Sequence, residues 1–511
     1  MGTDDTGDEP ATDHLSDDGA QTTPDSLGRQ VGRGALWSVA SNLTMRFASI
    51  AITAILARLL APDDFGIFAI ALAVFLVVSS LSEVGLGSAI ARSAKEPDDI
   101  APTAASMSIL VSAGLGIGMF ASAGWLASAL GQPEAAEPIR VLSICLALTG
   151  IFAVPGAQLV REFKQNRIFL GTVVGFLVAN PILVLLAVNG GGATAFAWSR
   201  VIGQVATGLV FYFSTSRRYR PGWRSQCIGP LLRFGLPLAL ANLVNWTLLN
   251  ADYMILGRLV NAAEVGVYMI AFNVASWSTA VLGSVLNNVV VPAFGRVSHD
   301  RARLGNALTM ASRLVALLAF PVGALTLALA GPLILSLFGA KWAESIPVLA
   351  VLAGYGVLYT FSLLYVNVLV AAGRTGRLLA IQFLWVVFLV PGMLAGEHAW
   401  GLAGVAWAHV LTIGLVAVPA YLVCVVRVAN ISMAEVIRVV APPAGAAVVA
   451  AAAAWAVSQL PSSPWLALAA GGTVGVLVYA CLVLPIVVRF VPPRFVPSWV
   501  PRWGRVEPAG S

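Results

Sequence analysis

The sequence predicts an all-α integral membrane protein with about fourteen transmembrane helices, arranged as two six-helix lobes and two further C-terminal helices. Of its 511 residues, 58% are hydrophobic and 11% are charged, which is more apolar surface than a soluble core can hide. The apolar residues form long runs, and a segment of the first half recurs in the second. These three observations place the chain in a lipid bilayer.

Fourteen apolar stretches are each close to the roughly 20 residues that a helix needs to cross a bilayer. The first stretch is too long, and lies too far along the chain, to be a cleaved signal peptide, so we expect it to remain as a span. The stretches lie near residues 35–57, 66–90, 103–128, 139–160, 168–188, 193–214, 233–256, 265–292, 307–330, 346–372, 377–395, 400–426, 436–458 and 465–488.

A repeat with an offset of 200 residues links the two halves of the chain. Residues 55–71 recur as residues 255–271 with seven of seventeen positions identical, and Asp64 is matched by Glu264. Six predicted spans separate the copies, so both enter the membrane from the same side, as parallel repeats with a pseudo-twofold axis along the membrane normal do. The repeat predicts a transporter whose two lobes move around a site between them.

Composition and repeat together divide the chain into five parts. Residues 1–28 contain eight acids and no Lys or Arg, in a Ser-, Thr-, Gly- and Pro-containing background that cannot pack, and this predicts a disordered tail. The five parts are the acidic cytoplasmic tail (1–30), an N-lobe with spans one to six (31–225), a C-lobe with spans seven to twelve (226–430), spans thirteen and fourteen (431–490), and a cytoplasmic C-terminal tail (491–511).

The thirty Lys and Arg residues predict the orientation. With a cytoplasmic N-terminus, twenty-one of them fall on cytoplasmic segments, four on outer connections and five in spans. This bias follows the positive-inside rule and predicts a multi-pass protein of the cytoplasmic membrane with both termini in the cytoplasm. The net charge of +6 therefore reflects topology and contact with anionic lipid headgroups, and nucleic-acid binding is not expected.

Polar residues inside the spans indicate the candidate site. Arg46 lies at the midpoint of the first span, where an Arg costs about 2.5–3.5 kcal/mol on insertion scales, and Asp252 is an intramembrane acid of the seventh span. Each shares a helix face with other polar residues, which predicts a hydrated cavity. The predicted substrate-binding residues are Ser38, Asn42, Arg46, Arg200, Gln204, Asn242, Asn245 and Asn273, and the ion-coupling candidates are Asp252 and Glu83.

Several of these residues have a structural alternative. Arg46 and Asp252 could instead form an ion pair between the lobes, since intramembrane charges are usually paired. His398 and His409 are expected to be hydrogen-bonded structural groups, with pH sensing as the alternative. The four cysteines show no metal-binding spacing, so no metal site is expected.

The sequence contains no Walker A motif, H-E-x-x-H, G-x-S-x-G or dinucleotide fingerprint, so the common machinery of ATP hydrolysis and hydrolase chemistry is absent. We therefore expect a transporter and not an enzyme. A membrane glycan polymerase, ligase or acyltransferase is the alternative from another class. Against it, the longest predicted outer connection, residues 331–345, is short for a catalytic domain.

Six segments carry a resemblance to a known family. They are Gly34 to Arg58, Leu60 to Gly66 and Glu83 to Ala89 in the first half, and Phe234 to Pro237, Asn250 to Asp252 and Gly257 to Arg258 in the second. These segments resemble polysaccharide and O-antigen flippases of the multidrug/oligosaccharidyl-lipid/polysaccharide superfamily. The resemblance covers about residues 30–490 and is more specific for the superfamily than for the substrate.

The resemblance implies a bundle whose first, second, seventh and eighth helices line a central cavity. It implies alternating-access transport of an oligosaccharide on polyprenyl (pyro)phosphate to the outer leaflet, for surface polysaccharide biosynthesis, with Arg46 contacting the phosphate. The implied partners are this lipid, membrane lipids, a polysaccharide polymerase and other assembly proteins. No cofactor is implied, and the implied driving force is H⁺, Na⁺ or the membrane potential. A cation-coupled multidrug or metabolite antiporter, or a lipid II flippase, is the alternative on the same architecture.

Overall fold

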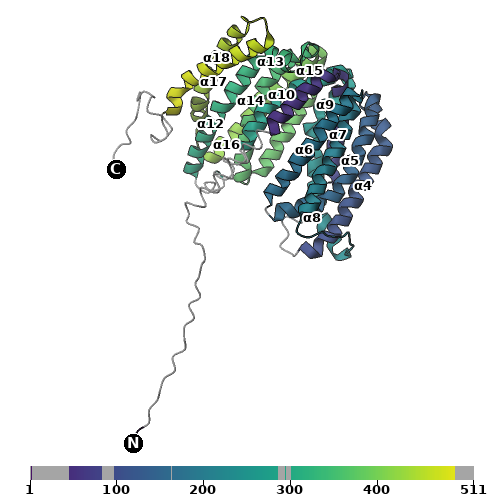
Figure 1. The fold of residues 1–511 in the computed structure, drawn as a ribbon. Coiled ribbons are helices and arrows are strands. Elements are labelled where there is room, and N and C mark those ends of the chain that lie inside the picture. Colours follow the sequence, from purple (N-terminus) through teal and green to yellow (C-terminus); the bar gives the residue numbers. More distant parts are fainter. Residues whose placement is uncertain are drawn as a thin grey trace. The chain divides into compact units, whose positions relative to one another are not determined.

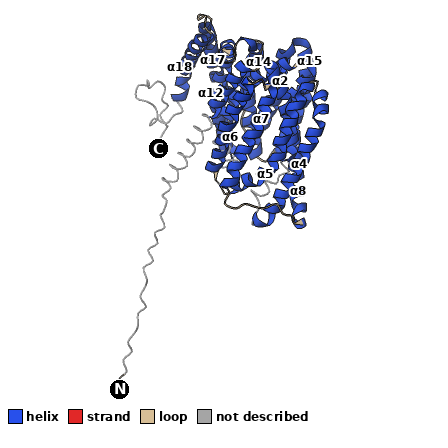
Figure 2. Cartoon of the chain, turned by 45° about the vertical axis from the view of Figure 1, so that its right-hand side comes forward, coloured by secondary structure: helices blue, strands red, loops and turns tan. Residues whose placement is uncertain are grey.

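The computed structural model describes residues 45–82, 97–162, 164–285 and 301–488, together with Gly2 and Phe294. All regular structure in these ranges is helical (Figure 2). The chain forms two compact units, residues 1–51 and residues 52–511. The first described helix, residues 45–59, begins in one unit and ends in the other.

The labelled helices all belong to the second unit (Figure 1). The predicted N-lobe contains α2 (Pro62–Ser82), α4 (Pro97–Ala129), η1 (Pro133–Ala135), α5 (Ala136–Arg161), α6 (Gln165–Val188) and α7 (Gly192–Ser214). The predicted C-lobe contains α8 (Ser225–Leu249), α9 (Ala251–Leu259), α10 (Ala262–Val285), α12 (Arg301–Ala328), α13 (Ala330–Leu337), η3 (Ala340–Trp342), α14 (Ser345–Ala371), α15 (Thr375–Thr412), the π-helical turn η4 (Ile413–Ala417) and α16 (Val418–Ala429). The last two helices are α17 (Met433–Ser458) and α18 (Pro464–Val488).

The predicted fold class is confirmed. Each of the fourteen predicted stretches contains described helix, and nine described helices are long and apolar enough to cross a membrane. One of these nine, residues 376–429, holds two predicted spans. The number of fourteen spans and the five-part division stay predictions. The predicted outer connection 331–345 differs from expectation, because α13 and η3 occupy most of it.

The eleventh and twelfth predicted spans are joined by a tight turn inside α15. Gly401 has φ 57° and ψ −142°, a backbone conformation that only glycine adopts without strain. On either side of the turn the two halves of α15 approach so closely that a Cβ on Gly396 would overlap the backbone of Gly404, and a Cβ on Gly404 that of Gly396. Three glycines therefore permit the hairpin that separates these spans.

The two copies of the sequence repeat pack against each other where α2 and α10 begin. Gly66 of α2 lies against the backbone of Ala262, and Gly266 of α10 lies against the backbone of Pro62. A Cβ at either glycine would overlap the carbonyl oxygen of the opposite helix. The contact is reciprocal and obeys the 200-residue offset, so the repeat seen in the sequence is also a symmetric helix crossing in space.

The matched acids of the repeat stabilise the starts of these two helices. The carboxylate of Asp64 accepts a hydrogen bond from the N–H of Ala61 at 3.0 Å, and that of Glu264 accepts one from the N–H of Asn261 at 3.1 Å. Each acid thus satisfies a backbone donor that the first helical turn leaves free, and its charge is favourable at a helix N-terminus. The Asp64–Glu264 match is explained by this capping.

Other side chains join the connections around this helix crossing. The buried Trp342 donates from Nε1 to the carbonyl of Ala57 at 2.8 Å, and its ring meets Phe65 edge-on at 5.0 Å. Gln132 donates from Nε2 to the carbonyl of Val260 at 3.0 Å. We call this end of the second unit, residues 57–66, 130–132, 257–266 and 337–342, the crossing end. Hydrogen bonds connect segments of this end that are far apart in sequence.

Candidate functional site

The predicted seventh span is broken at Asn250, about two helical turns before the crossing end. Asn250 leaves the helical conformation, with φ −118° and ψ 9°, and separates α8 from α9. Asp252 consequently lies in the first turn of a new helix, where a negative charge is favoured by the helix dipole and by free backbone donors. The N–H of Tyr253 donates to Oδ1 of Asp252 at 3.0 Å.

Asp252 is buried among aromatic rings. Its side chain is 3% exposed, and Tyr268 of α10 donates a hydrogen bond from its hydroxyl to Oδ2 at 3.3 Å. The rings continue from Tyr268 to Phe272, which stack with centroids 5.8 Å apart, and then to Tyr355 of α14 at 6.0 Å. The carboxylate therefore has neutral hydrogen-bond donors in a predominantly apolar setting.

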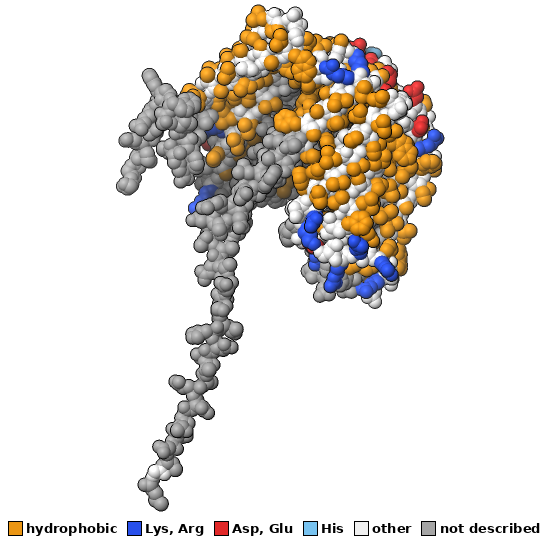
Figure 3. Space-filling model, in the orientation of Figure 1, with side chains coloured by type: hydrophobic (Ala, Val, Ile, Leu, Met, Phe, Trp, Pro, Cys, Tyr) orange, Lys and Arg blue, Asp and Glu red, His pale blue; other side chains and the backbone are white. Residues whose placement is uncertain are grey.

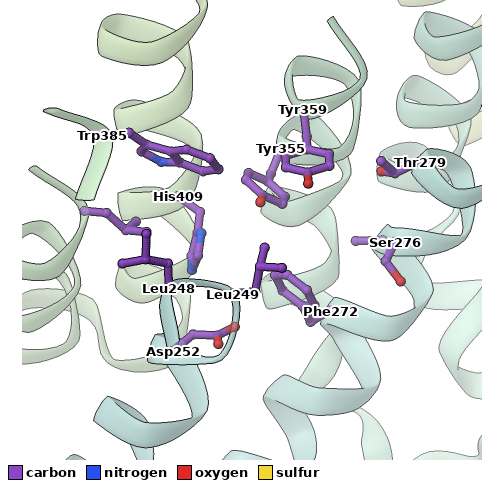
Figure 4. A pocket seen from close by; sticks show the side chains of 12 residues that line it. Leu248, Leu249, Asp252, Phe272, Ser276, Thr279, Tyr355, Tyr359, Trp385 and His409 are labelled. Atoms are coloured by element: carbon purple, nitrogen blue, oxygen red, sulfur yellow. The ribbon is translucent and has the colours of Figure 1, made fainter. Parts of the chain in front are cut away.

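Asp252 lines a cavity of about 230 Å³ that is enclosed by α8, α9, α10, α14 and α15. Figure 4 shows its side chains converging from these helices, with Tyr355, Tyr359 and Trp385 opposite the carboxyl group. Most lining atoms are apolar, and Asp252 is the single carboxylate among the lining residues. The lining residues are Leu248, Leu249, Asp252, Phe272, Ala275, Ser276, Thr279, Tyr355, Tyr359, Trp385, Leu389 and His409.

Two polar groups of the cavity lining lack hydrogen-bond partners. His409 is 5% exposed, and neither of its ring nitrogens has a partner among the described residues; Nε1 of Trp385 is in the same condition. The expectation that His409 is a hydrogen-bonded structural group is therefore wrong, because its packing neighbours are the rings of Tyr355 and Phe272. A buried polar group left without a partner costs about 1–3 kcal/mol, so this histidine needs another explanation.

The other C-lobe residues predicted for the site lie near the cavity but not in its lining. Asn242 is half-buried and Asn245 is exposed, both on α8 ahead of the lining residue Leu248. Asn273 of α10 is half-buried and donates from Nδ2 to the carbonyl of Met269 at 2.9 Å, one turn earlier in its own helix. The structure thus brings the seventh and eighth predicted spans together around Asp252. The binding roles of the three asparagines stay predictions.

Arg200 and Gln204 lie on α7 of the N-lobe. The guanidinium of Arg200 lies over the ring of Phe75 of α2, with Cζ 5.1 Å from the ring centroid. Its side chain is nevertheless exposed as a whole, and Gln204 is half-buried one turn further along. Neither residue lines the C-lobe cavity. Arg200 is therefore a separate cation, positioned by an aromatic face of the second predicted span.

The remaining predicted residues belong to the start of the chain or lie outside the described ranges. Arg46 is exposed on the helix 45–59, within the unit of residues 1–51. Ser38, Asn42 and Glu83 lie outside the described residues. The phosphate contact by Arg46, the alternative Arg46–Asp252 ion pair and coupling through Glu83 all stay predictions.

Sequence reasoning missed the aromatic half of the cavity. Tyr355, Tyr359 and Trp385 sit in strongly apolar stretches, where an aromatic side chain is usually read as packing or as a lipid-facing group. A usable signal was the spacing of Tyr355 and Tyr359, one helical turn apart in a span that also carries Thr360 and Ser362. Among the described residues no group of three His, Cys, Asp or Glu side chains could hold a metal ion.

Comparison with known sequences identifies the family. The model of the polysaccharide biosynthesis protein family matches residues 55–347. The succinoglycan biosynthesis transport protein ExoT of Rhizobium meliloti is 29% identical over 65% of this chain and 67% of its own length. The lipopolysaccharide biosynthesis protein WzxC of Escherichia coli is 23% identical over 76% of this chain and 79% of its own.

Solved structures show which fold the chain shares. The lipid II flippase MurJ, in an inward closed conformation, aligns with a TM-score of 0.71 at 14% identity, over 88% of this chain and 100% of its own. An inward-facing multidrug resistance MATE family transporter of the MOP superfamily aligns with a TM-score of 0.61 at 21% identity, over 75% and 94%. At these identities the likeness shows the fold alone.

The two-repeat helical bundle therefore has the fold of these solved membrane transporters, as the resemblance of the six segments implied. The matched family, the transport protein ExoT and the flippase MurJ all agree with the expectation of a transporter and not an enzyme. The chain belongs to the polysaccharide biosynthesis protein family, whose model covers more than half of its length.

Proposed function

We propose that the protein flips an oligosaccharide linked to polyprenyl (pyro)phosphate from the inner to the outer leaflet of the cytoplasmic membrane, for surface polysaccharide biosynthesis. The family match supports a polysaccharide precursor as cargo. The names of two relatives point the same way, since ExoT is a succinoglycan transport protein and WzxC a lipopolysaccharide biosynthesis protein. A polysaccharide polymerase that receives the flipped lipid is the proposed partner.

The observation that carries the transport mechanism is the reciprocal crossing of α2 and α10. Gly66 and Gly266 hold the two repeats in backbone contact near the start of each helix, which suits a pivot about which two lobes rock. Alternating access requires such rigid-body motion around a fixed site. In the state described here the crossing end is closed by the hydrogen bonds of Trp342 and Gln132.

We assign the crossing end to the outside of the cell. It consists of connections that the positive-inside rule places outward, while Lys and Arg side chains gather at the opposite ends of the helices near α8 (Figure 3). Hydrophobic side chains cover much of the surface between these ends, as contact with lipid requires. On this assignment the structure is closed to the outside, and both termini are cytoplasmic.

Arginine side chains are the proposed partners of the anionic phosphate. A guanidinium offers a planar pair of donors that matches phosphate oxygens, and Arg46 and Arg200 are the two arginines near the middle of predicted spans. Arg200 is exposed and its guanidinium is positioned by the ring of Phe75, and an arginine on an aromatic face keeps its N–H donors for a ligand. Asp252 is the proposed coupling residue for the ion gradient or membrane potential that drives transport.

A multidrug antiporter is the second candidate, because one carboxylate surrounded by aromatic rings also suits a lipophilic organic cation. The volume of the cavity argues against it. Pockets for drug-sized ligands usually measure about 300–1,000 Å³, and this cavity measures about 230 Å³. The cavity is more suitable for an ion and a few water molecules than for a drug.

The function is tested in a strain that lacks the protein. We expect the deletion strain to lose its surface polysaccharide and to accumulate the lipid-linked oligosaccharide on the inner leaflet, with unchanged drug susceptibility. Arg46→Gln and Arg200→Gln should fail to restore the polysaccharide at normal protein levels. The matched control is Arg140→Gln, since Arg140 is an exposed arginine at the predicted outer end of the fourth span. Increased drug susceptibility with normal polysaccharide would instead establish the antiporter.

A further inference from the structure

We infer that two loops at the predicted cytoplasmic side of the N-lobe form a fixed binding site for the headgroup of an anionic membrane phospholipid. The site consists of residues 161–162 and 164–167, where α5 ends and α6 begins, and residues 215–224, which link α7 to α8. We call it the basic junction. Figure 3 shows Lys and Arg side chains gathered at this end of the helices. The site goes beyond the proposed function, because the lipid that it binds is not the cargo.

The basic junction carries more positive charge than membrane topology alone explains. Its two sequence segments, 161–167 and 215–224, contain seven Lys or Arg residues and one acid, Glu162. The corresponding loops of the predicted C-lobe, residues 372–377 and 427–433, contain three Lys or Arg residues. The positive-inside rule applies equally to both pairs of loops. The excess in the N-lobe therefore points to an anionic ligand bound at this place.

A hydrogen-bonded triad fixes the beginning of the linker. The Oγ of Ser216 accepts a hydrogen bond from Nζ of Lys164 and donates one to Oε2 of Glu162 at 2.9 Å. Lys164 and Glu162 also form an ion pair, with Nζ and Oε2 2.6 Å apart. The triad holds the linker beside the loop that precedes α6. It also engages the one acid of the basic junction, whose net charge stays strongly positive.

Further contacts attach the rest of the linker to α4. The N–H of Gly222 donates to the carbonyl of Pro102 at 3.1 Å, and Oγ of Ser106 donates to the carbonyl of Gly222 at 2.8 Å. Between the two attachments, the half-buried Tyr219 packs against an apolar cluster of α4, α5 and α8. Residues 217–221 are thus presented from a fixed frame, which reduces the ordering cost that a ligand must overcome.

Two arginines of this frame are placed to meet a phosphate. Arg218 and Arg220 flank Tyr219, and both are exposed. The Cζ of Arg218 lies 5.1 Å from the ring centroid of Tyr212 and 5.3 Å from that of Phe213. An arginine held on aromatic faces keeps its N–H donors for a ligand, and its planar fork matches two phosphate oxygens.

The surface beside the basic junction favours a lipid over free phosphate as the ligand. Phe213 is 65% exposed although its ring lies against Arg218, and Phe169 and Leu170 near the start of α6 are exposed as well. Trp223 of the linker is 60% exposed, and aromatic rings of this kind lie at the level of lipid headgroups. A phospholipid brings a phosphate to the arginines and acyl chains to the apolar residues, whereas a free phosphate would contact the cations alone.

The experiment is native mass spectrometry of the purified full-length protein in a non-ionic detergent, with dioleoyl phosphatidylglycerol as the titrated lipid. We expect phosphatidylglycerol to bind at concentrations at which dioleoyl phosphatidylcholine does not, because the phosphatidylcholine headgroup has no net charge. In the double variant Arg218→Gln with Arg220→Gln the midpoint of binding should rise about thirtyfold, since each basic residue near the membrane surface adds to the attraction.

The matched control is the double variant Arg374→Gln with Arg377→Gln. It removes the same charge from two exposed arginines in the corresponding loop of the C-lobe, so the midpoint should keep its wild-type value. Arg218→Lys keeps the charge but loses the planar fork, and it should give an intermediate midpoint. Without lipid, all these variants should unfold at the wild-type temperature, so that weaker binding reports on the site and not on misfolding.

Four results would each overturn the inference. Equal binding of phosphatidylcholine would show unspecific lipid contact, and equal midpoints in the two double variants would show that the basic junction has no special role. Displacement of phosphatidylglycerol by glycerol 3-phosphate at similar concentration would establish a site for free phosphate. Preferential displacement by polyprenyl phosphate would establish a site for the cargo. No oligosaccharide is present in these measurements, so a failure of the proposed function would leave their outcome unchanged.

Discussion

Replacing Gly66 by alanine should disrupt the crossing of α2 and α10. A Cβ built on Gly66 would lie 2.7 Å from the carbonyl carbon of Ala262 and 2.9 Å from the nitrogen of Gly266, and it would overlap the Ala262 oxygen. Ordinary van der Waals contact begins at 3.4 Å. The helices would have to separate by more than about 0.7 Å, because the Ala262 oxygen is nearer to this Cβ than the carbonyl carbon is, and overpacking of this kind costs about 1–3 kcal/mol.

The assay is thermal unfolding of the purified protein in one detergent, with Gly124→Ala as the matched control. A Cβ on Gly124 of α4 meets no atom within 4 Å, so that variant should gain up to about 1 kcal/mol from the higher helix propensity of alanine. Gly66→Ala should instead unfold at a lower temperature than the wild type. Equal or higher stability of Gly66→Ala would refute the close crossing, since propensity alone favours alanine.

Three further predictions concern the connections between helices. Trp342→Phe should destabilise by about 1–3 kcal/mol, since it leaves the buried carbonyl of Ala57 without its donor; an unfolding temperature equal to that of the wild type would contradict this hydrogen bond. Gly401→Ala should destabilise by about 1–3 kcal/mol through the strained turn at φ 57°, measurable by the same unfolding assay, and a neutral effect would show that the turn differs. Burial raises the pKa of Glu162, but hydrogen bonds, including one from Lys164, outweigh burial and leave this pKa below its usual value. Glu162→Gln should therefore lower stability above about pH 4.3 and lose that effect as pH falls further, whereas a difference that persists at low pH would exclude the charge as its cause.

The sequence was sufficient for the parts of the fold that depend on solvent and on the repeat. Runs of about 20 apolar residues can be satisfied in lipid only by helices, so their positions were predictable to within a few residues. The repeat was also found from the sequence alone, by aligning its two copies. The contact of the copies at Gly66 and Gly266 was not predicted, because it depends on which helices are neighbours.

The candidate site was predictable only in part, because its properties depend on how five helices pack. Asp252 was recognised because any acid in a span is costly. The break at Asn250 also had a local signal, an asparagine followed by an acid in a first helical turn, although the apolar run concealed it. By contrast, nothing in the sequence around His409 indicates that its ring nitrogens lack partners, since aromatic neighbours from α10 and α14 create that condition.

The reciprocal packing at Gly66 and Gly266 also bears on how such a molecule could have arisen. Each glycine packs against the equivalent backbone position of the other repeat. Both copies therefore contribute the same groups to the crossing. Two identical half-length chains inserted in parallel would therefore contain every group that this contact needs. The crossing is in effect a homodimer interface within a single polypeptide, and joining the halves left each free to acquire charges, such as Asp252, that its counterpart lacks.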